Sequence, residues 1–358
     1  MANDTDLTQG PVWRALLRVS APMSLGILGV LMVGLADAFF LARYSEPALT
    51  AVGFIYPVIV TLTSLSIGLS AGTSAVVSNA LGAGGDDGMQ RLTGHVMLMG
   101  FAAASVVAFA FWLAGPWLFS FMGARGAVLE AVLAYIPWWC LSFPILAMSM
   151  SLNSVFRAAG QSGVAATVMV GQAALNVGFT PVLIFGFGPI PELGAEGAGM
   201  ATFIARAIAG AAVVAYALHK GVLCRDTRIF AGLGASARKV ARVAAPASLS
   251  NAINPGGMAA VTAAVAVAGD AAVGGFGAAT RVQSLIFVPM LALSSGIGPV
   301  VGQAWGAGNQ ARAREAMRLT VLFCLGYGLL LVVLTWSASG LIAGWMTSTS
   351  AQAEAATQ

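Results

Sequence analysis

Charged residues are scarce in this chain. Aspartate, glutamate, lysine and arginine together make up 8% of its 358 residues, whereas hydrophobic residues make up 58%. A soluble domain carries about 25% charged residues, so this chain lacks the polar surface that a protein surrounded by water needs. In lipid, a chain that is not a barrel has to be helical to satisfy its own backbone hydrogen bonds. The composition therefore predicts an all-α polytopic membrane protein.

The chain also lacks the patterns that mark other classes of protein. No basic face with polar or aromatic readers is present, which argues against nucleic-acid binding. The three cysteines, Cys140, Cys224 and Cys324, have no metal or redox spacing. No HExxH, GxSxG or GxxxxGK[ST] motif occurs, so hydrolytic and nucleotide-driven chemistry is not indicated. We expect no enzyme activity, no cofactor, no certain metal site and no obligate protein partner. An ion gradient is then the expected energy source.

Apolar runs long enough to cross a bilayer, about 20 residues each, are abundant. The N-terminus carries acids before its first basic residue and lacks a cleavage pattern, so the first run is predicted to be a retained helix. The predicted spans lie at roughly 15–42, 50–80, 93–115, 128–152, 164–187, 196–218, 242–268, 272–303 and 316–338. The lipid bilayer is thus the first expected partner.

Lysine and arginine are unevenly divided between the loops. With a cytoplasmic N-terminus, 13 of them fall in inside loops and only Arg43 and Arg125 in outside loops. Cytoplasmic loops are the ones enriched in positive charge, so we predict this orientation in a bacterial inner (plasma) membrane. Arg206 and Arg281 fall inside spans. We expect Arg206 to reach toward the inner interface. Arg281, with Gln283, is expected to line a central cavity, or Arg281 pairs with a backbone carbonyl.

The sequence repeats itself at an offset of 224 residues, without a gap over about eighty positions. Aligned pairs include Arg14 with Arg238, Pro22 with Pro246, Gly72 with Gly296, and Gly82-Ala83-Gly84 with Gly306-Ala307-Gly308. Six predicted spans precede the second copy, so both copies enter the membrane from the same side, as in parallel repeats of secondary transporters. We predict a first six-helix lobe at residues 1–222 and a second, incomplete lobe of about three helices at 223–358.

Asp37 is the only one of thirteen acids that lies well inside a predicted span. A charged side chain there costs roughly 3 kcal/mol or more unless it is paired, hydrated or protonated, so such a residue predicts function. We expect Asp37 to take up and release the coupling ion. The alternative is that it reaches the outer interface near Arg43 and only ends the helix. Pro22, fifteen residues earlier, predicts a bend that lets the helix move, unless it occupies the first helical turn.

Three further polar residues accompany Asp37. Asn176 and Thr180 are four residues apart and share one helical face, and Thr202 lies on the next predicted span. Amide and hydroxyl oxygens suit a protonated carboxyl group or a small hard cation. Each alone is more often a contact between helices, but together with Asp37 they predict one polar pocket in the first lobe.

Several segments make the chain resemble the multidrug and toxic compound extrusion (MATE) family from about Arg14 to Met346. They are SAPMSLG, GLADAFFLARYSEPALTAVGF, NALGAGG, NSVFRAAGQSG, LNVGFTPVLIFGFGPIPELGAEGAGMATFIAR and GAATRVQSLIFVPMLALSSGIGPVVGQAWGAGNQARARE. The resemblance implies a two-lobe bundle of twelve helices, of which about nine are present here. It also implies antiport of H⁺ or Na⁺ against cationic or amphipathic organic compounds.

The family's functional residues match this chain only in part. Its first-helix proline and aspartate match Pro22 and Asp37, and its fifth-helix asparagine and sixth-helix threonine match Asn176 and Thr202. Many members carry an acid where this chain has Thr180, and some use acids in helices seven and ten. Helix seven has none here and helix ten is missing. The resemblance thus implies a single-carboxylate site, which favours H⁺ over Na⁺.

Three alternatives stay open. A lipid-linked precursor flippase of the same wider superfamily would need a cationic central cavity. A membrane-embedded prenyl transferase would need paired acids at a metal-diphosphate site, whereas Asp37 is alone. An inactive truncated transporter fragment is the third alternative, because missing spans would expose polar helix faces to lipid.

Overall fold

The computed structural model describes residues 6–84, 89–223, 232–266, 276, 280 and 283–346, and nearly all of them are helical. The long helices within this part of the chain are α1 (Val12–Tyr44), α2 (Glu46–Gly82), α3 (Met89–Phe121), α4 (Gly126–Ala158), α5 (Ser162–Phe185), α6 (Gly194–His219), α7 (Leu233–Ala266), α9 (Val288–Gly306) and α10 (Gln310–Met346). The predicted all-α architecture is confirmed.

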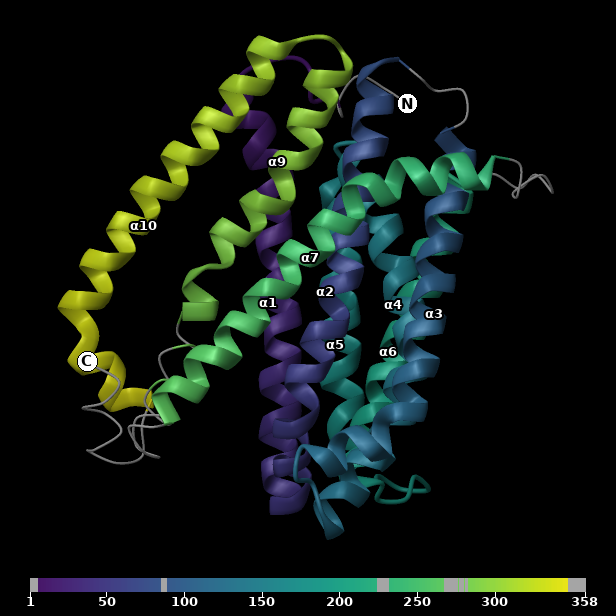
Figure 1. Cartoon of the computed structure of the whole chain (residues 1–358), viewed down its shortest axis with the longest axis vertical. Coiled ribbons are helices and arrows are strands. Elements are labelled where there is room, and N and C mark those ends of the chain that lie inside the picture. Colours follow the sequence, from purple (N-terminus) through teal and green to yellow (C-terminus); the bar gives the residue numbers. More distant parts are fainter. Residues whose placement is uncertain are drawn as a thin grey trace.

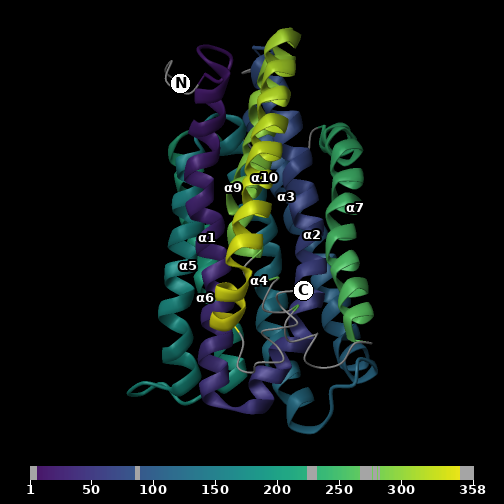
Figure 2. The same ribbon diagram turned by 90° about the vertical axis from the view of Figure 1, so that its left-hand side faces the viewer.

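The first six helices form one bundle, and the later helices are arranged along one side of it (Figures 1 and 2). Within the bundle, α4 packs against α2, α3 and α6, while α5 packs against α1 and α6. Of the later helices, α7 runs along α2, α9 packs on both α1 and α2, and α10 packs mainly on α9. Helices α1 and α2 therefore make most of the contact between the two predicted lobes.

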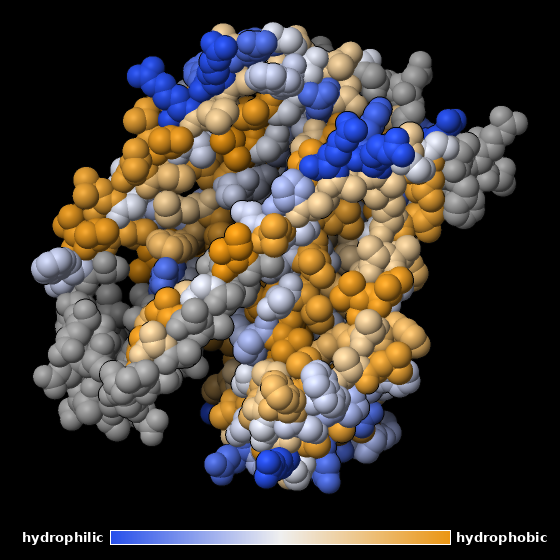
Figure 3. Space-filling model, in the orientation of Figure 1, coloured by the Kyte–Doolittle hydropathy of each residue, from blue (hydrophilic) through white to orange (hydrophobic). Residues whose placement is uncertain are grey.

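Seven helices in the described part of the chain are long and apolar enough to cross a membrane. They are α1 to α6 and the part of α10 from Gln310 to Leu334. The predicted span 242–268 corresponds to α7, and of the predicted span 272–303 the structure describes α9 from Val288 onward, so the count of nine spans is approximate. Hydrophobic side chains cover much of the flank of the molecule, and hydrophilic ones gather at its ends (Figure 3).

Proline at position 22 does not interrupt α1. The helix begins at Val12, directly after Pro11, so Pro22 lies in the helix interior, and the alternative that it occupies the first helical turn is not observed. Because proline has no N–H, the carbonyl of Arg18 loses its helical hydrogen bond. The hydroxyl of Ser162, at the start of α5, donates to that carbonyl at 2.9 Å. Helix α5 thus supplies the hydrogen bond that Pro22 cannot donate to the carbonyl of Arg18.

Close glycine contacts join the two copies of the repeat. A Cβ atom added at Gly72 in α2 would lie 2.8 Å from both the Cβ and the backbone N of Ala244 in α7. A Cβ added at Gly296 in α9 would overlap the side chain of Ser20 in α1. Under the offset of 224 residues, Gly72 aligns with Gly296 and Ser20 aligns with Ala244, so the two contacts are equivalent in the two copies. The same relation links a second pair of contacts, Gly82 with Gln303 and Gly306 with Asn79.

The segment before α1 is held against the turn between α9 and α10. Arg312 is 8% exposed, and its guanidinium bonds to this segment. It donates to the carbonyl oxygens of Leu7 (2.8 and 3.0 Å), Gln9 (3.0 Å) and Gly10 (2.6 Å). Gln303 accepts from the backbone N–H of Leu7 at 3.1 Å and donates to the carbonyl of Ala158, at the end of α4, at 2.6 Å. Three parts of the chain are therefore tied together at this end of the molecule.

Replacing Arg312 with glutamine is expected to release residues 7–10. A hydrogen bond to a charged group contributes about 2 kcal/mol, so losing that contribution should speed amide exchange in this segment about 30-fold. Hydrogen–deuterium exchange followed by mass spectrometry measures the change. Arg314→Gln is the matched control, because the contact that Arg314 makes within the described residues is an exposed one of 3.4 Å with Gln310. Equal exchange in the two variants would contradict a holding role for Arg312.

Candidate functional site

Asp37 faces α5 because small residues let α1 and α5 approach closely. A Cβ added at Gly29 would lie 3.3 Å from the Cβ of Ala173, and one added at Gly26 would lie 3.1 Å from the sulfur of Met169. Two turns beyond Gly29, the carboxylate of Asp37 accepts a hydrogen bond from the hydroxyl of Thr180 at 3.1 Å. Asp37 thus lies between the two helices, and α1 continues beyond it to Tyr44, so Asp37 does not end the helix.

Thr180 connects Asp37 to a chain of buried polar side chains. Its hydroxyl lies 3.5 Å from the side-chain oxygen of Asn176, one turn earlier on α5. The amide nitrogen of Asn176 donates to the hydroxyl of Thr202 on α6 at 3.1 Å, and Thr202 donates to the carbonyl of Ala198 at 3.1 Å. Asn176, Thr180 and Thr202 are all at least nine-tenths buried. The structure therefore brings the four predicted site residues together.

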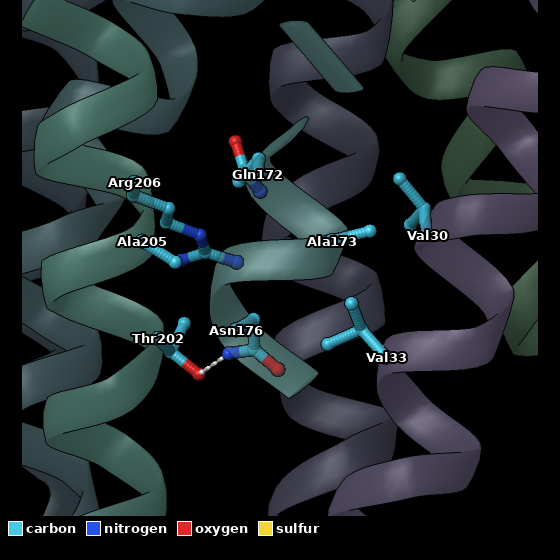
Figure 4. A pocket seen from close by; sticks show the side chains of 8 residues that line it. All are labelled: Val30, Val33, Gln172, Ala173, Asn176, Thr202, Ala205 and Arg206. Atoms are coloured by element: carbon cyan, nitrogen blue, oxygen red, sulfur yellow. Dashed lines mark hydrogen bonds between the residues drawn. The ribbon is translucent and has the colours of Figure 1, made fainter. Parts of the chain in front are cut away.

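A small pocket opens beside this chain of hydrogen bonds, between α1, α5 and α6. Figure 4 shows that Val30 and Val33 approach it from one side and that the side chain of Arg206 extends into it from the other. Its lining consists of Val30, Val33, Gln172, Ala173, Asn176, Thr202, Ala205 and Arg206. The pocket therefore combines an apolar wall from α1 with amide, hydroxyl and guanidinium groups from α5 and α6.

The side chain of Arg206 points in a different direction from the one expected. It was expected to reach toward the inner interface, but it points into the pocket one turn after Thr202. Its Nη1 donates to the hydroxyl of Ser142 at 2.7 Å, and its guanidinium lies 5.9 Å from the ring centre of Trp139, both on α4. The buried Ser142 hydroxyl and the ring of Trp139 thus hold the side chain of Arg206 inward. The i, i+4 spacing of Thr202 and Arg206 was a sequence feature that could have revealed this shared face.

Tyr135 on α4 also belongs to this neighbourhood and was missed by the sequence analysis. Its side chain is 8% exposed, contacts that of Thr202 and interacts electrostatically with both Asp37 and Arg206. No spacing in the sequence relates Tyr135 to residues on α1, α5 and α6. Only the packing of α4 against α6 brings it to the site.

The remaining predicted residues lie elsewhere. Pro22 is in the other half of α1, fifteen residues before Asp37. Gln283 is exposed, and its backbone carbonyl accepts from the N–H of Phe287 at 2.9 Å. Arg281 lies outside the described residues. Arg43 lies over the ring of Phe39 at 4.3 Å. The structure therefore does not bring Gln283 to the polar cluster around Asp37.

The chain is similar to a family model and to two named relatives. The chain matches the MatE family model over residues 22–182 and 246–358. It is 34% identical over 332 residues to the FAD transporter of Shewanella oneidensis, covering 91% of this chain and 73% of that relative. It is 25% identical over 330 residues to the probable multidrug resistance protein NorM of Thermotoga maritima, covering 89% of this chain and 69% of the relative.

Solved structures of a MATE transporter are also similar to this chain. The chain resembles the crystal structure of a mutant of the Vibrio cholerae MATE transporter VcmN with a TM-score of 0.90, and that of VcmN in the bent form with a TM-score of 0.88. Each match has 27% sequence identity and covers 96% of this chain and 77% of the other. The predicted MATE-like helical bundle and the prediction of a transporter, not an enzyme, are confirmed. The chain therefore belongs to the MatE family of multi-pass membrane transporters.

Proposed function

We propose that this protein is a secondary antiporter that exports organic cations or amphipathic compounds in exchange for H⁺ or Na⁺, with Asp37 as the ion-binding residue. One observation carries the proposal. A carboxylate inside a membrane-spanning helix accepts a hydrogen bond from Thr180, which joins it to Asn176 and Thr202. An ionisable group at such a depth is costly and marks an ion pathway.

The acceptor to which the Thr180 hydroxyl donates its proton is expected to depend on the charge of Asp37. It has one proton to donate and lies within reach of two acceptors, the carboxylate of Asp37 and the side-chain oxygen of Asn176. An ionised Asp37 is the stronger acceptor, so it holds the Thr180 proton. A protonated Asp37 is the weaker acceptor and lets Thr180 turn toward Asn176. Binding of the coupling ion then alters the contact between α1 and α5.

Pro22 is the proposed hinge of this movement. The carbonyl of Arg18 has its hydrogen bond from Ser162 of α5 in place of one from its own helix. That bond can break when α1 and α5 move apart, without disturbing the rest of the helix. The part of α1 that carries Asp37 can then swing as a unit.

The cargo path is proposed to lie between a first lobe at residues 1–222 and a second lobe at 223–358. The glycine contacts related by the offset of 224 residues support this division. The positive-inside distribution of lysine and arginine supports a cytoplasmic N-terminus in a bacterial inner membrane. In that orientation Asp37 lies toward the outer end of α1, where an ion from outside can reach it.

A flavin dinucleotide is the second candidate for the cargo, because a relative with 34% identity is an FAD transporter. The lipid-linked precursor flippase is a further alternative. It depends on a cationic central cavity and hence on Arg281, which lies outside the described residues. Cargo identity therefore has to be tested with compounds of opposite charge.

Transport into liposomes tests the proposal. The purified chain is reconstituted, an inside-acid pH gradient is imposed, and uptake of ethidium is compared with uptake of FAD. We expect one of them to enter faster than into protein-free liposomes, with the excess abolished by nigericin. An inside-high Na⁺ gradient is the parallel arm. Uptake equal to that of protein-free liposomes for both compounds under both gradients would overturn the proposed antiport.

A further inference from the structure

Arg206 is a cation inside a membrane-spanning helix that is held mainly by neutral groups. Its Nη1 donates to the hydroxyl of Ser142 and its guanidinium lies over Trp139, while its buried Nε has no hydrogen-bond partner among the described residues. None of the residues that line its pocket is acidic. The carboxylate that interacts with it electrostatically is that of Asp37. The guanidinium stays protonated in proteins, so its positive charge is a fixed property of the pocket.

The same pocket holds the oxygens that a metal cation would need. Asn176 and Thr202 line it together with Arg206, and Asn176 leads through Thr180 to Asp37. Two of these oxygens already accept hydrogen bonds, since the Thr202 hydroxyl accepts from Asn176 and Oδ1 of Asp37 accepts from Thr180. A metal cation would thus have to compete for few oxygens beside a guanidinium. Figure 4 shows the guanidinium and the side chain of Asn176 converging on the same space.

A fixed cation repels any second cation, but the consequence differs between Na⁺ and H⁺. As a general scale, two unit charges about 8 Å apart at an effective dielectric constant of about 20 repel by about 2 kcal/mol, which weakens binding of the second cation about 30-fold. Sodium would lose this binding free energy without regaining it elsewhere, because a bound sodium ion needs several oxygen ligands. A proton needs one oxygen, and a carboxyl group in an apolar site favours its neutral form. Asp37 can therefore bind and release a proton despite the repulsion from Arg206.

We propose that Arg206 is the residue that makes the Asp37 site selective for H⁺ and excludes Na⁺ from it. The inference rests on the proposed function and deepens it, because it names the coupling ion and the side chain that chooses it. When Asp37 is ionised, Arg206 balances its charge across the pocket. When Asp37 takes up a proton, the pocket carries the charge of Arg206 alone.

Binding of radioactive ²²Na⁺ to the purified full chain tests the inference directly. We expect no saturable Na⁺ binding to the unchanged protein. Arg206→Met removes the charge but keeps an unbranched side chain, and it should bind Na⁺ at least about 30-fold more tightly. Arg206→Lys restores the charge and should abolish that binding again. The double variant with Asp37→Asn should also lose it, which assigns the Na⁺ to the carboxylate.

The outcomes separate this inference from the proposed function. Saturable Na⁺ binding to the unchanged protein that disappears in Asp37→Asn would overturn the role of Arg206, and it does so even if the methionine variant fails to fold. A folded Arg206→Met variant without Na⁺ binding would overturn it as well. Neither result depends on transport, so antiport can fail in liposomes while the Na⁺ measurement still decides the ion selectivity.

Discussion

Replacing Asp37 with asparagine is expected to reduce gradient-driven transport to the leak rate of protein-free liposomes. The amide has nearly the shape of the carboxylate and can accept the hydrogen bond from Thr180 through its oxygen. It cannot take up a proton or neutralise a metal ion. The contact between α1 and α5 then stays in one state, whatever the ion concentration outside. Uptake of ethidium or FAD under an imposed pH gradient measures the loss.

Two controls separate coupling from folding in this experiment. Glu130→Gln makes the same chemical change at an exposed carboxylate near the start of α4, and it should keep at least half of the transport rate. The Asp37→Asn protein should melt at the same or a higher temperature, because a partly buried charge has been removed. Gradient-driven transport in Asp37→Asn equal to that of Glu130→Gln would contradict an ion-binding role for Asp37.

Replacing Gly72 with leucine is expected to destabilise the packing between the two predicted lobes severely. The first added atom would already lie 2.8 Å from the backbone N of Ala244, so α2 and α7 would have to separate. Overpacking of this kind costs about 3 kcal/mol, with further loss from contacts that can no longer form. Thermal unfolding and size-exclusion chromatography of the purified variant should show early melting or aggregation.

Gly53→Leu is the matched control on the same helix. A Cβ atom added at Gly53 meets no atom of the described part of the chain within 4 Å, and both glycines lie inside α2. Leucine is a better helix former than glycine, so this variant should gain up to about 1 kcal/mol. The difference between the two variants then reports the clash between α2 and α7. Equal melting temperatures for both would contradict the close packing of Gly72 against Ala244.

Much of the fold could be predicted from the sequence, because the bilayer leaves few choices. Low charge and long apolar runs require membrane helices, and the predicted first six spans correspond to α1 to α6. The helices extend beyond most of the predicted limits, since hydropathy marks the apolar centre of a helix and not its ends. The start of the predicted span 272–303 stays a prediction, because the structure there describes residues 276, 280 and those from 283 onward, and the long helix α9 begins at Val288.

The candidate site could be predicted only in part. Spacing on one helix placed Asn176 and Thr180 on a common face, and the structure shows that relation. The contact of Thr180 with Asp37 depends on the register between α1 and α5, which the glycines at the helix interface set. Arg206 was assigned the wrong direction, because partners on α4 determine where its side chain points. Sequence patterns thus describe single helices, whereas side-chain contacts between helices require the packed structure.

Proton release on cargo binding is the most direct test of the claim that Asp37 exchanges a proton against cargo. The purified chain is placed in weakly buffered detergent solution with a pH-sensitive dye, and the transported compound is added. Because coupling between two ligands is reciprocal, we predict release of about one proton per cargo molecule bound. The Asp37→Asn variant should bind the compound without releasing protons. Cargo binding without proton release by the unchanged protein, or equal release by the variant, would contradict the account.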